Sequence, residues 1–183
     1  MCDKQTLLAT LNDEILNCKK CCLADKQILY GHGNRDSEIM MIGESPSLVP
    51  EGNKQVFGHK SLAPFTAFLQ TLGLKLEDVY ITNIVKCYIP HENTGNQKHC
   101  IDIVLKEINI VNPEYIILFG KKVSQILLER YIKTAADLNG GYYPTIDRKY
   151  FTVYHPMVVN YRTITLEEYK AIAEKVRKII SKG

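Results

Sequence analysis

Short apolar segments alternate with segments of helical periodicity along the whole chain. The predicted strands are 37–43, 79–86, 114–120 and 149–155, and the predicted helices are 4–17, 61–72, 101–112, 123–131 and 166–179. Strands that read as continuous apolar runs are buried on both faces, and helices between such strands connect them in parallel. The sequence therefore predicts an α/β fold with a mainly parallel sheet covered on both faces. Segment 139–144, which carries two glycines and a proline, indicates a turn.

The length and composition suit one domain over residues 1–183. Of the 183 residues, 45% are hydrophobic and 23% charged, a balance typical of globular proteins and not of disordered ones. No apolar run approaches the ~20 residues needed to cross a bilayer, and the amphipathic N-terminus lacks the apolar core of a signal peptide. We therefore expect a cytoplasmic protein with no membrane partner. A formal net charge of +3 permits an acidic partner such as nucleic acid without requiring one.

Polar residues and glycines follow the predicted strands. Gly43 and Glu44 follow the first strand, and Asn83 lies near the end of the second. Gly120 ends the third strand, and His155 ends the fourth. In open parallel sheets the carboxyl ends of the strands share one edge, where binding sites form. The sequence therefore predicts a functional site built from these positions.

Four of the six cysteines have the pattern of metal ligands. Cys18 and Cys21 are separated by two residues, Cys87 ends a predicted strand, and Cys100 begins a predicted helix. Four thiolates suit either a tetrahedral zinc ion or a [4Fe–4S] cluster. The alternative is that Cys87 and Cys100 are small core residues, because cysteines without disulfides are often buried. The other two cysteines, at positions 2 and 22, are interpreted as bystanders.

The sequence resembles the iron–sulfur, or family 4, uracil-DNA glycosylases of the uracil-DNA glycosylase superfamily. The resemblance runs from Cys18 to about Arg162. It rests on the order and spacing of C-x-x-C-x-L (18–23), G-x-G-N (31–34), IGESP (42–46), Phe57, VYITNIVKC (79–87), ILFG (117–120) and YHP (154–156). It implies a three-layer α/β/α fold with a central four-stranded parallel sheet. It also implies a [4Fe–4S] cluster in preference to zinc, held by Cys18, Cys21, Cys87 and Cys100, which ties the N-terminal segment to the core.

The candidate site residues also have a chemical interpretation. The Asn83 amide can accept from uracil N3–H and donate to O4, whereas cytosine presents the reverse pattern. Phe57 lies in a polar loop, and its ring could stack on a flipped base. An N–H of His155 aimed at uracil O2 would stabilise the departing base anion. The alternatives are structural: an amide tying down a loop, a core ring and a structural hydrogen-bond donor.

The remaining candidates lie in the first and last motifs. Gly43 permits close approach of the backbone to a base, and Ser45 of IGESP is expected to bind substrate with it. Glu44 could orient the attacking water or stabilise the sugar cation, or merely cap the next segment. From Met157 to Arg162 the chain could supply an apolar wedge and a phosphate contact, or form an ordinary surface loop.

The expected function is base excision repair. We expect a monofunctional hydrolase that removes uracil from single- or double-stranded DNA, acts as a monomer and leaves an abasic site. No lysine at a strand end supports Schiff-base chemistry, because Lys86 adjoins a predicted cluster cysteine. Ser47 stands where the family usually has glycine, so activity on hypoxanthine or xanthine is one alternative. A catalytically silent, cluster-bearing protein that binds nucleic acid is the other.

Overall fold

The computed structural model describes residues 3–20, 28–48, 54–55, 57–88, 98–129, 134 and 136–182. Its helices are α1 (Lys4–Leu16), α2 (His59–Leu72), α3 (Lys98–Val111), α4 (Lys121–Leu128), α5 (Met157–Asn160) and α6 (Leu166–Ile180). Its strands are β1 (His32–Gly33), β2 (Ile39–Gly43), β3 (Ser47–Leu48), β4 (Lys54–Gln55), β5 (Tyr80–Asn83), β6 (Tyr115–Phe119), β7 (Asn139–Pro144) and β8 (Lys149–Val153). Two short 3₁₀ helices span Leu76–Asp78 and Ala136–Leu138.

Four parallel strands form the centre of a six-stranded sheet with the order β1-β5-β2-β6-β8-β7. The edge strands β1 and β7 run antiparallel to their neighbours. Every residue of β2, β5 and β6 is buried, as expected of apolar strands covered on both faces. The predicted α/β fold with four central parallel strands is confirmed. The sheet itself is larger than predicted, because each edge carries one additional antiparallel strand.

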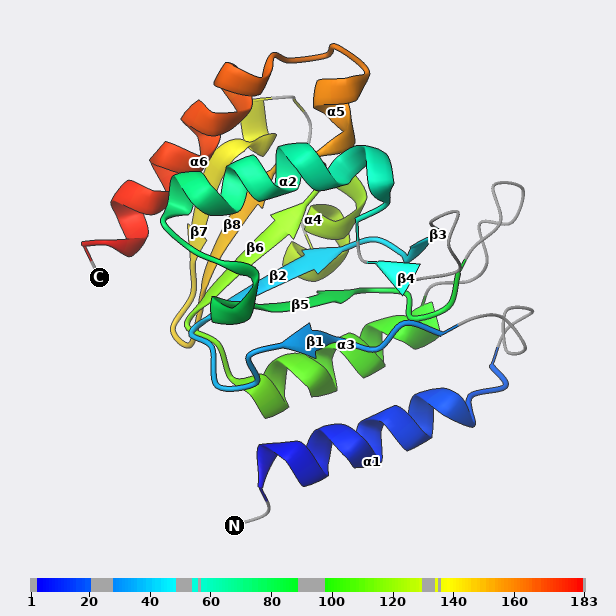
Figure 1. The fold of residues 1–183 in the computed structure, drawn as a ribbon. Coiled ribbons are helices and arrows are strands. Elements are labelled where there is room, and N and C mark those ends of the chain that lie inside the picture. Colours follow the sequence, from blue (N-terminus) through cyan, green and yellow to red (C-terminus); the bar gives the residue numbers. More distant parts are fainter. Residues whose placement is uncertain are drawn as a thin grey trace.

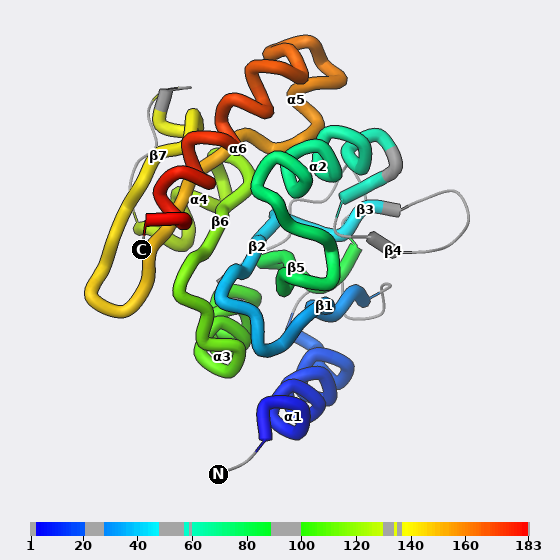
Figure 2. The backbone as a smooth tube through the Cα atoms, turned by 60° about the vertical axis from the view of Figure 1, so that its left-hand side comes forward, coloured from blue at the N-terminus to red at the C-terminus, as the bar shows by residue number. Residues whose placement is uncertain are grey.

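Helices cover both faces of this sheet (Figure 1). On one face α2 and α6 pack against each other, over a core that includes Phe68, Phe119 and Tyr169. On the other face α3 and α4 pack around a second core that includes Met40 and Leu118. Helix α1 lies on the outer side of α3, at the N-terminal end of the chain (Figure 2). The carboxyl ends of the four parallel strands lie between these two helical layers.

The segment 139–144 is a strand and not the predicted turn. It forms β7, which pairs with β8 through a register shift between Asn139 and Gly141. Gly140 has a φ of 75°, which glycine adopts readily, so the glycines form an irregularity within a strand. The turn that joins β7 to β8 follows instead, where Thr145 N–H donates to the carbonyl of Arg148 at 2.8 Å. An edge strand tolerates this composition because only one neighbour has to pair with it.

Several element ends differ from the predictions by a few residues. Helix α2 begins at His59 after an N-cap at Gly58, two residues before the predicted start at residue 61. Its predicted end at residue 72 is confirmed, and the following Gly73 has the left-handed φ of 77° common at helix C-termini. The strand predicted over 79–86 ends at Asn83, because the following backbone turns to bond the chain after β2. None of the described helices has the length and apolar character required to cross a membrane.

Candidate active site

The alternation of side chains along the strands brings three predicted site residues to one face. The odd-numbered apolar residues of β2, β5 and β8 belong to the core beneath α2 and α6. Gly43 and Asn83 continue this alternation at the ends of β2 and β5, where they are register partners. His155 continues it two residues beyond β8. These three residues therefore share the α2–α6 side of the sheet, at the carboxyl ends of its strands.

Asn83 is buried, and its amide has no hydrogen-bond partner among the described residues. Only 2% of the residue is exposed, and neither Nδ2 nor Oδ1 has a hydrogen-bond partner within the described residues. An unpaired amide in such a place typically costs about 1–3 kcal/mol. Within the described residues, no hydrogen bond of the Asn83 side chain supports the alternative that this amide ties down a loop. The amide therefore presents one donor and one acceptor to a ligand of complementary pattern.

His155 is held as a neutral donor. The backbone N–H of Met157 donates to its Nδ1 over 3.2 Å, so the proton of the neutral ring lies on Nε2. Burial lowers the pKa of His155, and the negative charge of Glu44 only partly opposes this effect. The imidazole is therefore uncharged at neutral pH and has its N–H at the nitrogen that does not contact Met157.

Phe57 joins the core to the site. Its ring centroid lies 4.3 Å from that of Phe65 and 5.1 Å from that of Phe119, so the residue is a core anchor. The same ring lies 5.7 Å, centroid to centroid, from the imidazole of His155. The residue directly after it, Gly58, leaves room for the side chain of Ser47, which a Cβ at position 58 would approach to 2.8 Å. Phe57 is thus packed on one side and borders His155 on another.

Glu44 follows β2 and forms an ion pair that the sequence did not indicate. The Nζ of Lys122, in the first turn of α4, donates to Oε1 of Glu44 at 2.7 Å. The effect of Glu44 on the pKa of His155 shows that its charge also reaches the imidazole. Ser45 is half-buried directly after Glu44. The signal that could have revealed Lys122 is the pair of lysines at a helix N-terminus, where the helix dipole disfavours cations.

The segment after His155 forms a compact turn on the surface. Met157 accepts a hydrogen bond at its sulfur from the Ser61 hydroxyl of α2 at 3.9 Å, so this methionine contacts α2. Arg162 is exposed and has a left-handed φ of 55°. Between them Tyr161, which the sequence reasoning did not single out, is 75% exposed. The protruding side chains of this turn are therefore Tyr161 and Arg162.

Three of the four predicted cluster cysteines are described, whereas Cys21 lies outside the described residues. Cys18 follows the end of α1, and Cys100 lies in the first turn of α3. The two helices pack antiparallel, because Lys4 bonds the carbonyl of Val111 near one end while Glu14 pairs with Lys106 nearer the other (Figure 1). Cys18 and Cys100 therefore lie at the same end of this helix pair.

The third described cysteine lies at the same edge. Cys87 pairs with Ile28 in an isolated antiparallel bridge just after β5, and it packs with Cys100 against the core under α3 and α4. All three side chains are half-buried. Among the residues that the structure describes, no group of three or more ligand-type side chains could hold a metal ion by itself. The arrangement fits a four-thiolate cluster in its ligand type and in the shared end of the sheet, with Cys21 as the ligand still to be placed.

A buried ion pair lies between Asn83 and Cys87. Lys86 contacts Glu107 of α3 and donates to the carbonyl of Asn83 at 2.8 Å, and both charged residues are at most 2% exposed. Glu107 also accepts from the hydroxyls of Tyr80 and Thr82, each at 2.9 Å. Burial and the charge of Glu107 raise the pKa of Tyr80. This network fixes the end of β5 to α3. It also engages the ammonium group of Lys86, the first lysine after β5.

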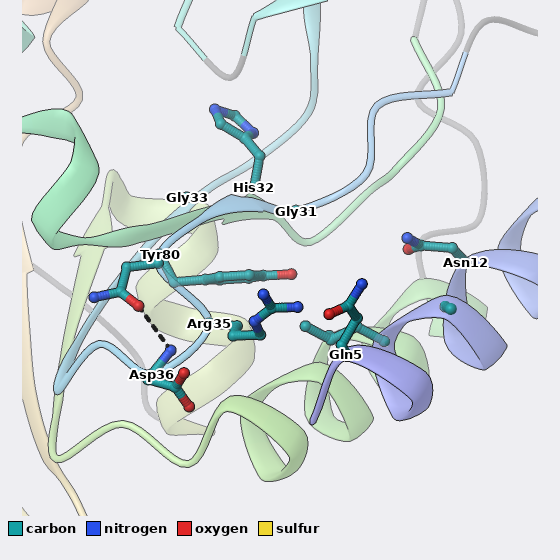
Figure 3. Close-up of a pocket in the computed structure, with 11 residues that line it drawn as sticks. Gln5, Asn12, Gly31, His32, Gly33, Arg35, Asp36 and Tyr80 are labelled. Atoms are coloured by element: carbon teal, nitrogen blue, oxygen red, sulfur yellow. Dashed lines mark hydrogen bonds between the residues drawn. The ribbon is translucent and has the colours of Figure 1, made fainter. Parts of the chain in front are cut away.

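A hollow elsewhere on the molecule does not belong to this site. It lies between α1 and β1, has a volume of about 520 Å³ and includes Gln5, Asn12, Arg35 and Tyr80 in its lining (Figure 3). Its wall is stiffened where the backbone N–H of Asp36 donates to Oδ1 of Asn34 at 3.0 Å. None of its lining residues was predicted to bind substrate.

The fold and the strand-end residues define an α/β protein with polar side chains gathered at the carboxyl edge of a parallel sheet. Residues 30–177 match the uracil-DNA glycosylase superfamily, and the chain belongs to this superfamily.

Its relatives include three type-4 uracil-DNA glycosylases. The one from Archaeoglobus fulgidus is 29% identical over 182 residues, which cover 92% of this chain and 91% of that protein. The one from Thermotoga maritima is 25% identical over 194 residues, which cover 100% of this chain and 99% of that protein. The one from Pyrobaculum aerophilum is 29% identical over 164 residues, which cover 83% of this chain and 84% of that protein. The predicted family resemblance is confirmed.

Proposed function

We propose that this protein is a monofunctional uracil-DNA glycosylase of base excision repair. It hydrolyses the N-glycosidic bond of uracil in DNA, releases uracil and leaves an abasic site. The observation that carries this proposal is the Asn83 amide, which is buried at a strand end and has no hydrogen-bond partner in the part of the chain that the structure describes. Its relatives of type 4, which carry the name uracil-DNA glycosylase, support the same substrate.

Asn83 reads the edge of the base. A target nucleotide has to leave the stack before its base can enter such a site. In the proposed complex Oδ1 of Asn83 accepts from N3–H of uracil, and Nδ2 donates to O4. Cytosine reverses both groups and would leave the buried amide unpaired. The backbone of Gly43 and the following Ser45 lie beside the base, and Phe57 supplies the ring that faces it.

His155 stabilises the departing base. As the glycosidic bond breaks, the electron pair leaves with uracil and negative charge develops at O2. The Nε2–H of neutral His155 donates to this oxygen, while Nδ1 stays occupied by the N–H of Met157. The ring is thus oriented before the reaction starts.

Glu44 acts on the sugar side of the broken bond. Loss of the base leaves positive charge on the deoxyribose, and a water molecule then adds its oxygen at the anomeric carbon and gives up a proton, which neutralises the uracil anion. The ionised carboxylate of Glu44 stabilises this charge or orients the water. Lys86 is unsuited to act as a covalent nucleophile, because it is buried in its pair with Glu107.

A [4Fe–4S] cluster on Cys18, Cys21, Cys87 and Cys100 belongs to the same proposal. When bound, the cluster would supply a structural cross-link between the N-terminal segment and the sheet, and the excision reaction uses Asn83, His155 and Glu44. The turn from Met157 to Arg162 faces the DNA. Met157 packs within this turn, the exposed ring of Tyr161 lies on its outside, and Arg162 contacts phosphate. The partner is uracil-containing DNA, single- or double-stranded, and the enzyme acts as a monomer in the cytoplasm.

A panel of damaged oligonucleotides tests the function. Strands that carry a single uracil, hypoxanthine or xanthine are incubated with excess protein, and released base and abasic sites are quantified. We expect excision of uracil to exceed that of the other two bases. Preferred release of hypoxanthine or xanthine would favour a divergent superfamily enzyme, as the altered first motif around Ser47 allows. Binding without release of any base would favour a silent nucleic-acid-binding protein.

A further inference from the structure

We propose that Lys122 is a positioning residue for base excision and that it acts through Glu44. The proposal rests on the proposed function, because it assigns to Lys122 the task of holding the carboxylate that faces the sugar. The direct observation is the 2.7 Å contact between Nζ of Lys122 and Oε1 of Glu44. The two residues are 78 positions apart and come from different elements.

The backbone places Lys122 with little freedom. Helix α4 begins directly after Gly120, whose φ of 98° lets the chain reverse at the end of β6. Gly120 N–H donates to the carbonyl of Val153 at 2.8 Å, and the hydroxyl of Ser124 donates to the carbonyl of Gly120 at 2.9 Å. The first turn of α4 is therefore fixed to the same strand ends that carry the site.

Position 122 is an unfavourable place for a lysine if only the stability of helix α4 is considered. A cation in the first turn opposes the helix dipole, and an ion pair this exposed adds little to stability. The side chains of Lys122 and Glu44 are 44% and 41% exposed. Neither helix stability nor core packing therefore explains the pair. Holding the Glu44 carboxylate directly after β2, at the strand ends where Gly43 and Asn83 are register partners, does explain it.

The consequence for the reaction is geometric. A glutamate at the end of a strand has three rotatable bonds and can turn toward solvent. Lys122 holds Oε1, so the carboxylate stays on the side of the sheet where the sugar cation forms. Because small displacements of a reacting group lower rates steeply, removing this contact is expected to affect the chemical step more than DNA binding.

Four variants test the proposal by single-turnover excision from a uracil strand, together with DNA affinity and thermal unfolding. We expect Lys122→Met to lower the rate at saturating protein by about 10-fold or more and Lys122→Arg to restore most of it. Lys121→Met is the matched control, since it removes the neighbouring positive charge of the same helix, and its saturated rate should stay within about 2-fold of the parent. In a Glu44→Gln background, adding Lys122→Met should cost less than about 2-fold, as expected for residues that act as one unit.

Other outcomes overturn the proposal in distinguishable ways. A loss of affinity in Lys122→Met that matches Lys121→Met, with an unchanged saturated rate, would assign Lys122 to phosphate binding. Independent, multiplicative losses in Lys122→Met and Glu44→Gln would show that Lys122 does not act through Glu44. Parent-like excision by Glu44→Gln would show that neither Glu44 nor Lys122 has the proposed role, although the protein would still excise uracil. Only failure of the parent protein to release uracil would overturn the proposed function itself.

Discussion

At the scale of single residues, burial determines the charge state of His155. Burial lowers its pKa, so the ring loses its proton below the ordinary value of about 6.5. The neutral, donating form is therefore present at pH 6.5 and above, and it is lost as the pH falls through the lowered pKa. Protonation would also place a proton on Nδ1, where the N–H of Met157 now donates. We expect ¹⁵N shifts at pH 6.5 to report mainly the Nε2–H tautomer, and excision to fall only at more acidic pH.

The assignment has a simple control. His155→Gln identifies the imidazole signals by their disappearance, and His155→Ala should lower the single-turnover rate by about 10²–10³-fold, as expected for one preorganised donor. A signal from His155 that titrates above pH 6.5, or carries its proton on Nδ1, would contradict the proposed donor. Parent-like excision by a folded His155→Ala protein would assign the residue to structure.

At the scale of the elements, the Lys86–Glu107 pair joins β5 to α3. Removing one partner of a buried pair leaves an uncompensated charge, which typically costs about 3–5 kcal/mol. We therefore expect Lys86→Met to lower the free energy of unfolding by this amount. Replacing both partners, as in Lys86→Met with Glu107→Leu, should recover most of the loss, because a packed apolar pair needs no desolvation of charge. Denaturant unfolding of the variants, at matched iron content, measures both effects.

The exposed pair between the same helix and α1 is the control for this prediction. Lys106 and Glu14 are 52% and 44% exposed, so Lys106→Met should cost no more than about 1 kcal/mol. If Lys86→Met were as stable as the parent, the network would not anchor the end of β5. A double variant less stable than Lys86→Met would instead show that Tyr80 and Thr82 depend on the Glu107 carboxylate.

The elements also show what sequence patterns can predict. Continuous apolar runs identified the strands β2 and β6, because a strand buried on both faces needs apolar residues at every position. The same signal was absent from β7, whose glycines indicated a turn and whose pairing depends on β8. The strand ends placed Asn83 and His155 in the site. The contact of Lys122 with Glu44 and that of Lys86 with Glu107 were not predictable, because each joins residues that are distant in sequence.

At the scale of the whole molecule, we expect the proposed cluster to tie the N-terminal segment to the sheet. Helix α1 packs on α3 through a small core of Leu11, Ile15 and Ile103. Such a limited contact holds a helix weakly unless the chain is also tied down elsewhere. We expect anaerobically purified protein to contain about four irons and four sulfides per chain. Cys18→Ala or Cys87→Ala should bleach it and increase hydrogen exchange in α1, while the central strands stay protected.

Variants of the other two cysteines serve as controls. Cys2→Ser and Cys22→Ser should keep the colour and the exchange pattern of the parent. Stoichiometric zinc without sulfide would exclude the iron–sulfur assignment. Unchanged exchange in α1 after loss of the cluster would show that its contact with α3 is sufficient.

The most direct test concerns the buried amide of Asn83, because the proposed function rests on this amide, which has no hydrogen-bond partner within the described residues. The measurement is single-turnover excision from matched strands that contain uracil or cytosine, by the parent and by Asn83→Asp. The parent should favour uracil by about 10⁴–10⁵-fold, the discrimination reached by sites whose polar groups would otherwise stay unpaired. Asn83→Asp should lose most uracil excision, because an ionised carboxylate cannot donate to O4 and repels the departing anion. A folded Asn83→Asp protein that removes uracil as fast as the parent would contradict the assignment of Asn83 as the residue that reads the base.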